Sequence, residues 1–395
     1  MMRELAPQSS DGGYVRPTYG FRGTIGSPEF PADSGRYHVY LGNACPWCHR
    51  VALALVLLGI GGSVSSSRML DDPERASRGG WAFGPGGFED PVFGCSDLRA
   101  VYDLCQPGYQ GRCTAPLLVD RKTRSISQSS RDSDFLRCCV AIGTTGKSLK
   151  NVSQCLRCCS SNFNAVWTQL ERSKRRRIVN NESSDIIRHL NAAVVALLSG
   201  SGSGSEGTLG GVVELRPVAL AEEIDRINEM TYTKLNNAVY RCGFATSQKA
   251  YEAALADVVE GLERCDELLS KRRFLAGDVF TEADLRLFPT IIRFDVVYAT
   301  LFKCQRRRVV DSPNVSAWMR DVYQLPGVAA TIDVGDAIRS YYTNLFPLNP
   351  GGIVPLGPDA EDLELEREAN RGSRDHEAVF VSRAFPVQSN GHLIL

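Results

Sequence analysis

The sequence predicts a small α/β domain followed by an all-helical domain, and two features of its hydrophobic pattern support this architecture. Before residue 199, short segments rich in β-branched and aromatic residues alternate with helical segments. Beyond Gly211, apolar residues recur every three or four positions, as they do on the buried face of a helix. A Ser/Gly run at 199–211 separates the two patterns and can bury no core of its own. A chain of 395 residues is long enough for two cores.

The first domain opens with a strand–helix–strand unit. Residues 36–41 are rich in aromatic and β-branched residues and predict a strand. A buried helix follows, which begins at Pro46, contains the apolar run 51–58 and stops at Gly59. Proline suits the first helical turn because its missing N–H would have no partner there. Three further segments predict strands: 63–69, 116–120 and 177–179.

The end of this domain predicts a hairpin and a helix. The strands at 116–120 and 177–179 would pair, and Asn181 would cap a helix over 182–190 with Glu182 at its positive end. Residues 127–174 interrupt the hairpin with a polar, Ser- and Cys-rich stretch that has no clear period. We expect this stretch to be a disordered insertion, and its composition also fits a retained intron.

Long amphipathic helices predict the second domain. Apolar residues from Leu220 to Leu235 lie on one helical face, and a 3,4 repeat from Leu255 to Leu269 predicts the next helix. Thr281 and Asp284 fit the capping box that opens a third helix. The expected organisation is an N-terminal extension (1–34), the α/β domain (35–198), a linker (199–211), the helical domain (212–358) and a disordered tail (359–395).

Composition limits the classes of partner. Lys plus Arg and Asp plus Glu each number 45, which argues against electrostatic binding of nucleic acid or anionic membrane. No apolar stretch approaches the roughly 18 residues of a membrane span. The first twenty residues lack a continuous apolar run, so we expect no secretory signal. The 13 cysteines are odd in number and irregularly spaced, so we expect a reducing compartment. A cytoplasmic location is favoured, with a plastid or a mitochondrion left open.

Cys45-Pro46-Trp47-Cys48 follows a predicted strand and opens a predicted helix. Free backbone N–H groups and the positive end of the helix dipole favour thiolate over thiol at such a position. A four-ligand metal site would need a second cysteine pair in a matching context. The only cysteine cluster available, at 155–159, lies in the expected insertion. The motif therefore favours redox or nucleophilic chemistry, and we expect no metal.

These residues resemble the active-site segment of the Xi-class, omega-like glutathione transferases, the glutathionyl-hydroquinone reductases. The resemblance runs from Tyr14-Val-Arg-Pro17 to Gly351-Gly-Ile-Val-Pro-Leu-Gly-Pro358 and includes Gly35 to Arg50. Five further motifs occur in order: Gly80–Phe83, Arg112–Pro116, Ile178–Ser184, Asn236–Tyr240 and Ile338–Tyr342. The resemblance implies a thioredoxin-like N-terminal domain and a helical glutathione-transferase domain behind it. It also implies a homodimer.

The resemblance also implies roles for individual residues. Cys45 would attack the glutathionyl sulfur of a glutathionyl-hydroquinone, and Tyr240 and Tyr341 would donate hydrogen bonds to the quinol. Glutathione, as co-substrate, would bind to residues that the family motifs share: Trp81, Ala115, Pro116, Glu182 and Ser183. Pro116 would be a cis-proline that turns the Ala115 backbone toward the tripeptide. Glu182 would bind the γ-glutamyl ammonium and Ser183 its carboxylate.

Several positions leave alternatives open. Many relatives have alanine at Cys48, so a second thiol here could add resolving chemistry. Either Tyr341 or Tyr342 could face the site, whereas core packing is favoured for Tyr298 and a helix-surface position for His49. The leading function is reductive deglutathionylation of glutathionyl-hydroquinones. The alternatives are a general thioltransferase or dehydroascorbate reductase, and a non-catalytic glutathione- or ligand-binding protein.

Overall fold

The computed structural model of the chain describes residues 6–72, 75, 80–122, 177–199, 212–345, 348–372 and 379–383. The expected insertion at 127–174 lies outside these residues, as does all of the expected linker except Ser199.

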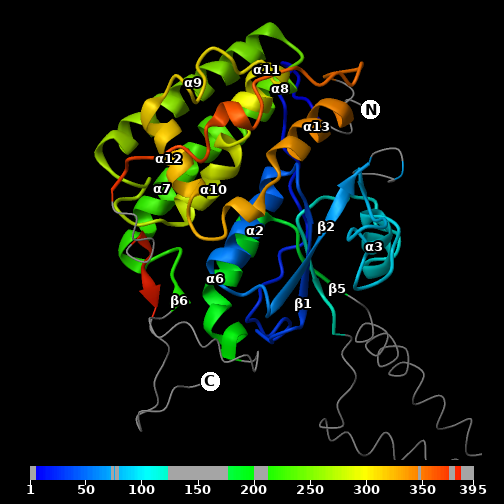
Figure 1. The fold of residues 1–395 in the computed structure, drawn as a ribbon. Coiled ribbons are helices and arrows are strands. Elements are labelled where there is room, and N and C mark those ends of the chain that lie inside the picture. The colour runs from blue at the N-terminus through cyan, green and yellow to red at the C-terminus, as the bar shows by residue number, and fades with distance from the viewer. Residues whose placement is uncertain are drawn as a thin grey trace, which may run out of the picture.

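A five-stranded mixed sheet forms the centre of the first domain, in the order β3-β2-β1-β4-β5 (Figure 1). Strand β1 (Tyr37–Gly42) pairs in parallel with β2 (Val64–Asp71) and antiparallel with β4 (Leu117–Asp120). Strand β5 (Arg177–Asn180) pairs antiparallel with β4, which confirms the predicted hairpin. The two-residue edge strand β3 (Trp81–Ala82) pairs with β2 and was not predicted, because so short a strand has no periodicity.

Helices cover both faces of this sheet. Helices α2 (Pro46–Leu57) and α6 (Ser183–Ser199) lie on the face toward the second domain, and α3 (Leu98–Cys105) lies on the other (Figure 1). Alternate strand residues point to opposite faces of a sheet. Accordingly, Val39 belongs to the core that contains α2 and α6, whereas Tyr40 belongs to the core under α3. Because β1 leads directly into α2, the start of α2 lies at the carboxyl end of β1.

The second domain is helical, as predicted (Figure 1). Its main helices are α7 (Ala221–Thr231), α8 (Ala238–Gly243), α9 (Gln248–Lys271), α10 (Glu282–Ile291), α12 (Pro313–Tyr323) and α13 (Val334–Asn344). Shorter elements are η1 (Val218–Leu220), the π-helices η2 (Tyr232–Asn236) and η3 (Phe294–Tyr298), α11 (Ala299–Leu301) and η4 (Ala329–Thr331).

The capping box predicted for the third helix is present at the start of α10. The Thr281 hydroxyl accepts from the Ala283 N–H, and the Asp284 carboxylate accepts from the Thr281 N–H at 3.0 Å. Asp284 also accepts from the Trp318 indole at 3.0 Å. This buried carboxylate therefore joins α10 to α12 and fixes the start of the helix that packs on α2.

The segment after Pro358 differs from the expected disordered tail. Residues 359–372 and 379–383 lie along the helical domain, with η5 (Glu361–Leu363) at their start. Leu363 and Leu365 are buried there, although acidic residues surround them in the sequence and mask their apolar character. Strand β7 (Ser382–Arg383) pairs with β6 (Val212–Val213) at the beginning of the helical domain.

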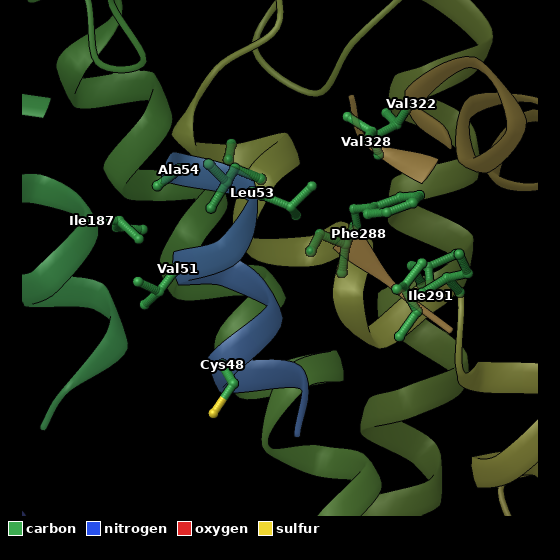
Figure 2. Packing of buried hydrophobic residues seen from close by; sticks show 14 of the residues in the cluster. Cys48, Val51, Leu53, Ala54, Ile187, Phe288, Ile291, Val322 and Val328 are labelled. Carbon is green, nitrogen blue, oxygen red and sulfur yellow. The ribbon is translucent and has the colours of Figure 1, made fainter. Parts of the chain in front are cut away.

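Helix α2 joins the two domains. It packs on α6 of its own domain and on α10 of the other. Val51, Leu53 and Ala54 have no exposed surface and lie in one apolar cluster with Ile187 of α6 and Phe288 of α10 (Figure 2). The N-terminus of α2 is consequently held at the boundary between the domains. None of the helices in the described residues has the length and apolar character that a membrane span requires.

Candidate active site at the start of helix α2

Cys45 is the N-cap residue of α2. Its backbone is extended, its N–H donates to the Gly42 carbonyl at 3.2 Å, and its sulfur accepts from the Cys48 N–H at 3.4 Å. The same sulfur lies 3.7 Å from the carbonyl oxygen of Ala115. The predicted position of the thiol at the helix start is confirmed, and the free N–H groups of the first turn face it.

The electrostatic environment separates the two cysteines of the motif. Burial raises the pKa of Cys45, but the Cys48 thiol, the N–H groups of Cys48 and Trp47 and the Arg293 charge outweigh it and lower that pKa. Burial, the hydrogen bond to Cys45 and the Cys45 charge all raise the pKa of Cys48 well above its ordinary value. These contacts favour the thiolate form at Cys45 and keep Cys48 a thiol, which donates to it.

Three tyrosines form a hydroxyl cluster, and two of them, Tyr240 and Tyr298, lie close enough to this sulfur for its charge to act on them. The Tyr240 hydroxyl on α8 lies 2.8 Å from that of Tyr341 on α13, and the Tyr298 hydroxyl lies 3.1 Å from that of Tyr341. Burial is the main reason why the pKa of each phenol is raised, and the Cys45 charge adds to it for Tyr240 and Tyr298. The cluster is therefore protonated at neutral pH and able to donate.

The structure distinguishes between the aromatic candidates. Of the adjacent pair, Tyr341 is the residue whose hydroxyl joins Tyr240. Tyr298, for which core packing was favoured, is fully buried but also contributes its hydroxyl to the cluster.

Trp81 lies half-buried on β3, with its ring packed against Gly42. A Cβ added to Gly42 would lie 2.1 Å from this ring. The indole therefore lies over the strand end that leads into Cys45.

The loop before β4 approaches Cys45 from the other side. The Ala115–Pro116 peptide bond is cis, as predicted. The Asn181 amide donates to the hydroxyls of Tyr102 at 3.1 Å and Thr114 at 3.3 Å, which connects this loop to the start of α6.

Asn181 was expected to cap α6, and this prediction is wrong because its side chain makes these two hydrogen bonds instead. The cap comes from Glu182, whose carboxylate accepts from the Ser184 N–H at 3.3 Å.

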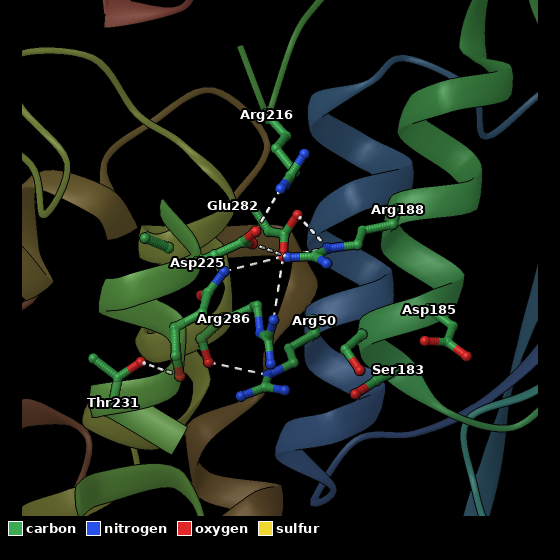
Figure 3. A network of polar contacts seen from close by, with 12 residues as sticks. Arg50, Ser183, Asp185, Arg188, Arg216, Asp225, Thr231, Glu282 and Arg286 are labelled. Carbon is green, nitrogen blue, oxygen red and sulfur yellow. Dashed lines mark hydrogen bonds and ion pairs between the residues drawn. The ribbon is translucent and has the colours of Figure 1, made fainter. Parts of the chain in front are cut away.

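Glu182 borders a polar cavity of about 390 Å³ between the domains. Arg50 and Arg286 also line it, beside the ion pairs that Arg188 forms with Glu282 and Asp225 (Figure 3). Ser183 is buried, and its hydroxyl donates to the Glu182 carboxylate at 3.4 Å. Its neighbour Ser184, not Ser183 itself, lines the cavity.

His49 was expected on the helix surface, and this prediction is wrong. Its imidazole is buried, with Nε2 at 2.8 Å from the Thr331 hydroxyl and Nδ1 at 3.0 Å from the Arg293 guanidinium. Its position just after the apolar start of α2 gave no sign of these partners, because both come from the second domain.

Sequence reasoning also missed two arginines. The Arg16 guanidinium lies 3.9 Å from the centre of the Trp47 ring, and Arg293 donates to backbone carbonyls next to Cys45. Arg16 belongs to the family motif Tyr14–Pro17, and its place in that motif is the only sign in the sequence that it lies near the site. Among the described residues, no group of three His, Cys, Asp or Glu side chains could hold a metal ion.

Comparisons with known proteins agree with this geometry. Residues 248–321 match the family described as glutathione S-transferase, C-terminal domain. The chain is 36% identical to glutathionyl-hydroquinone reductase PcpF of Sphingobium chlorophenolicum, over 89% of this chain and 91% of that protein. It is 32% identical to glutathionyl-hydroquinone reductase YqjG of Escherichia coli, over 89% and 90%.

Solved structures give the same result. The glutathione S-transferase Xi from Phanerochaete chrysosporium superposes with a TM-score of 0.68 at 31% identity, over 89% of this chain and 94% of that one. The glutathione-bound structure of Escherichia coli YqjG superposes with a TM-score of 0.67 at 31% identity, over 91% and 97%. Both similarities extend over the two domains.

Proposed function

The chain belongs to the Xi-class glutathione transferases that include the glutathionyl-hydroquinone reductases, and we propose that Cys45 is the residue that carries its reaction. The reaction is the glutathione-dependent reductive deglutathionylation of glutathionyl-hydroquinones. The N-terminal domain is accordingly thioredoxin-like, and the C-terminal domain is the helical domain of a glutathione transferase. The observation that carries the assignment of Cys45 is the place of its sulfur at the N-cap of α2, where it accepts from the Cys48 N–H, near the hydroxyl cluster of the three tyrosines.

In the first step, the Cys45 thiolate attacks the glutathionyl sulfur of the substrate. A sulfur–sulfur bond forms, the bond from sulfur to the aromatic carbon breaks, and the electron pair of that bond leaves with the carbon. A proton from Tyr240 or Tyr341 completes the free hydroquinone. The pKa values of these phenols are raised, which supports this role because they hold their protons until the leaving carbon or its conjugated oxygen needs one.

In the second step, a further glutathione thiolate attacks the glutathionyl sulfur of the mixed disulfide. Glutathione disulfide leaves, and Cys45 is the departing thiolate. The two glutathione sulfurs, now joined as glutathione disulfide, have supplied the two electrons that reduced the carbon–sulfur bond, and Cys45 is regenerated. The contacts that lower the pKa of Cys45 also make it a good leaving group here.

We propose that glutathione binds between Cys45 and the start of α6. The Ala115 backbone, after which the chain turns at Pro116, would pair with the tripeptide as an added strand. Trp81 would pack on it beside Gly42. Glu182 would bind the γ-glutamyl ammonium, and its place at the edge of a cavity of about 390 Å³ supports this. Ser183, which the family motif implies, and Ser184, which lines the cavity, would present the first turn of α6 to the carboxylate, because N–H groups there favour anions.

Mass spectrometry tests the assignment of Cys45. Incubation of the protein with excess glutathionylated quinol should place one glutathione on Cys45. Cys45→Ser should keep the fold and the affinity for glutathione but lose all turnover, because a hydroxyl cannot form the mixed disulfide. Glutathione found reproducibly on Cys48 alone, or turnover that persists in Cys45→Ser, would contradict the assignment.

One observation favours a second activity. The Cys48 thiol donates to Cys45 and could resolve a mixed disulfide from within the protein. This pair supports reduction of small glutathione mixed disulfides, as in a general thioltransferase. The ratio of kcat/KM for a small mixed disulfide to that for a glutathionyl-hydroquinone measures which activity dominates. We expect the quinol adduct to be the better substrate, because the tyrosine cluster is of use only to it.

We further propose that the protein is a homodimer and that it resides in the cytoplasm. Light scattering coupled to size exclusion should give twice the chain mass of 43.3 kDa. A monomer mass at micromolar concentration would exclude the dimer. Imaging of a C-terminally tagged chain tests the location, with plastid and mitochondrial markers in the same cells.

A further inference from the structure

Arg293, which joins α10 to η3 in the second domain, reaches across the domain boundary to the loop before Cys45. Its Nη2 donates to the Asn43 carbonyl at 2.8 Å, and its Nε donates to the Ala44 carbonyl at 3.0 Å. These carbonyls belong to the two residues directly before Cys45. A planar guanidinium can hold two neighbouring carbonyls in this way, and the ammonium of a lysine cannot.

The other side of the guanidinium is also fixed. Its Nη1 donates to the Pro289 carbonyl at 2.9 Å and to His49 Nδ1 at 3.0 Å. Burial is the main cause that lowers the pKa of His49 well below its ordinary value, so the imidazole is neutral. Because Nδ1 accepts, Nε2 carries the proton and donates to the Thr331 hydroxyl.

Arg293 is 1% exposed, and none of the salt bridges among the described residues includes it. Its partners are carbonyl oxygens and a neutral ring, so its positive charge is not cancelled by a carboxylate. A buried charge of this kind acts strongly on a neighbouring ionisable group, because little water screens it. The Cys45 sulfur is one of the groups on which this charge acts, and the charge favours its thiolate.

We propose that Arg293 is a positioning residue for Cys45, which holds the Asn43–Ala44 loop so that the sulfur meets the N–H groups of α2 and which stabilises its thiolate. The proposal rests on the assignment of Cys45 as the reacting thiol. It makes the reactivity of a thiol in the first domain dependent on an arginine from the second. His49 is the support that orients the guanidinium and adds no charge of its own.

The other ionisable groups that face Cys45 differ in charge from Arg293. Cys48, on the same helix, is a neutral donor. Tyr240 of α8, Tyr298 of η3 and Tyr341 of α13 are neutral phenols, since burial raises the pKa of each. Arg293 is therefore the cation, among the described groups that act on Cys45, whose removal should change its ionisation.

The test measures the thiolate without any substrate. The rate at which iodoacetamide alkylates Cys45 is followed against pH in a Cys48→Ala background, with peptide mapping to identify the modified thiol. Arg293→Met should lower this rate about tenfold at pH 6, which corresponds to a rise of about one pKa unit, and should recover it above pH 9. Arg293→Lys keeps the positive charge but loses the paired donation to the Asn43 and Ala44 carbonyls. The alkylation rate at pH 6 should therefore fall about threefold.

Two further variants keep the test decisive. Arg273→Lys changes another largely buried arginine of the same domain, which pairs with Asp321, and should leave the pH profile unchanged. His49→Leu removes the acceptor of Nη1 but leaves the guanidinium in place, and a loss of about twofold at pH 6 is expected. This variant carries the test if Arg293→Met does not fold.

An unchanged midpoint in both Arg293→Lys and His49→Leu would overturn the proposal, as would an equal loss of rate at every pH. A purely structural role predicts that second result. The outcome is separate from that of the proposed function. A protein that never deglutathionylates quinols would still show the shifted alkylation profile if Arg293 positions Cys45.

Discussion

The hydroxyl of Tyr240 lies 2.8 Å from that of Tyr341, although 101 positions separate the two residues in the chain. One belongs to the short helix α8 and the other to α13, which is the last of the long helices. The Ser340 hydroxyl, beside Tyr341, donates to the Asp71 carboxylate at the end of β2. The sheet of the first domain therefore helps to set the position of a phenol beside Cys45.

Tyr240→Phe should slow the reduction of a glutathionyl-hydroquinone by about 100-fold, the lower part of the range for a positioned proton donor. Reduction of a small mixed disulfide should change by less than about threefold, because its leaving group is a thiolate that needs no proton on carbon. Stopped-flow measurement of both reactions gives the comparison. Equal slowing of the two reactions would indicate a packing role for Tyr240.

Cys48→Ala should retain most activity, since external glutathione can resolve the mixed disulfide. The loss in kcat should stay below about tenfold at pH 8, or about 1.4 kcal/mol. The loss should grow as the pH falls, because the Cys48 thiol is one of the contacts that lower the pKa of Cys45. A larger loss that is independent of pH would indicate a dithiol mechanism instead.

The sequence predicted the local part of this site, and the reason is physical. Cys45 is placed by the strand before it and by Pro46 after it, so short-range rules sufficed. Core packing was favoured for Tyr298, and the residue is buried in the core, but its hydroxyl also joins that of Tyr341. Tyr298 ends a π-helix, in which the extra residue per turn rotates the side chains away from the positions that a regular helix would give them.

Contacts across the domain boundary were not predictable in the same way. Nothing near His49 in the sequence announces Arg293 or Thr331 as its partners. The cap of α6 was misjudged by one position, because Asn181 has a long-range partner in Tyr102 that no local rule contains. The predicted order of strands and helices needed only periodicity, and it was confirmed.

Asp71→Asn should stabilise the protein at pH 8. Burial raises the pKa of Asp71 from 3.8 to about 6, so the folded protein binds a proton between these values that the unfolded chain does not. The contribution of Asp71 to the free energy of unfolding therefore increases as the pH falls from about 6 toward 4. Above pH 6, the ionised carboxylate lowers the free energy of unfolding by up to about 3 kcal/mol. Asparagine removes this cost and keeps an acceptor for Ser340.

Denaturant unfolding at pH 5 and pH 8 measures the Asp71 effect. We expect the variant to gain about 1–3 kcal/mol over the wild type at pH 8 and about half as much at pH 5. Asp72→Asn is the matched control, since that carboxylate lies 3.9 Å from Arg75 near the surface, and its effect should be below about 0.5 kcal/mol. A gain of the Asp71→Asn variant over the wild type that is larger at pH 5 than at pH 8 would contradict a raised pKa of Asp71.

The last prediction concerns residues 127–174, which we expect to be dispensable. Asp120 of β4 and Arg177 of β5 are paired residues of one hairpin, which a short turn could close. Closing a long loop costs only slightly more than closing a moderate one, because the entropy grows with the logarithm of its length. We therefore expect the fold to tolerate the segment without needing it. Arg177 must be kept, because it pairs with Glu29 and lies 5.1 Å from the centre of the Phe30 ring.

The experiment replaces 127–174 with a short Gly-containing turn and measures Tm, glutathione affinity and reductase activity. All three should be unchanged or improved. A second variant that keeps the length but shuffles the sequence of the segment separates an effect of loop length from an effect of particular residues. Unfolding of the shortened protein, or loss of glutathione binding in both variants, would show that the segment packs against the first domain. The pairing of β4 with β5 would then depend on contacts from this segment. Both strands have only four residues, and their pairing contains a register shift between Leu118 and Val119.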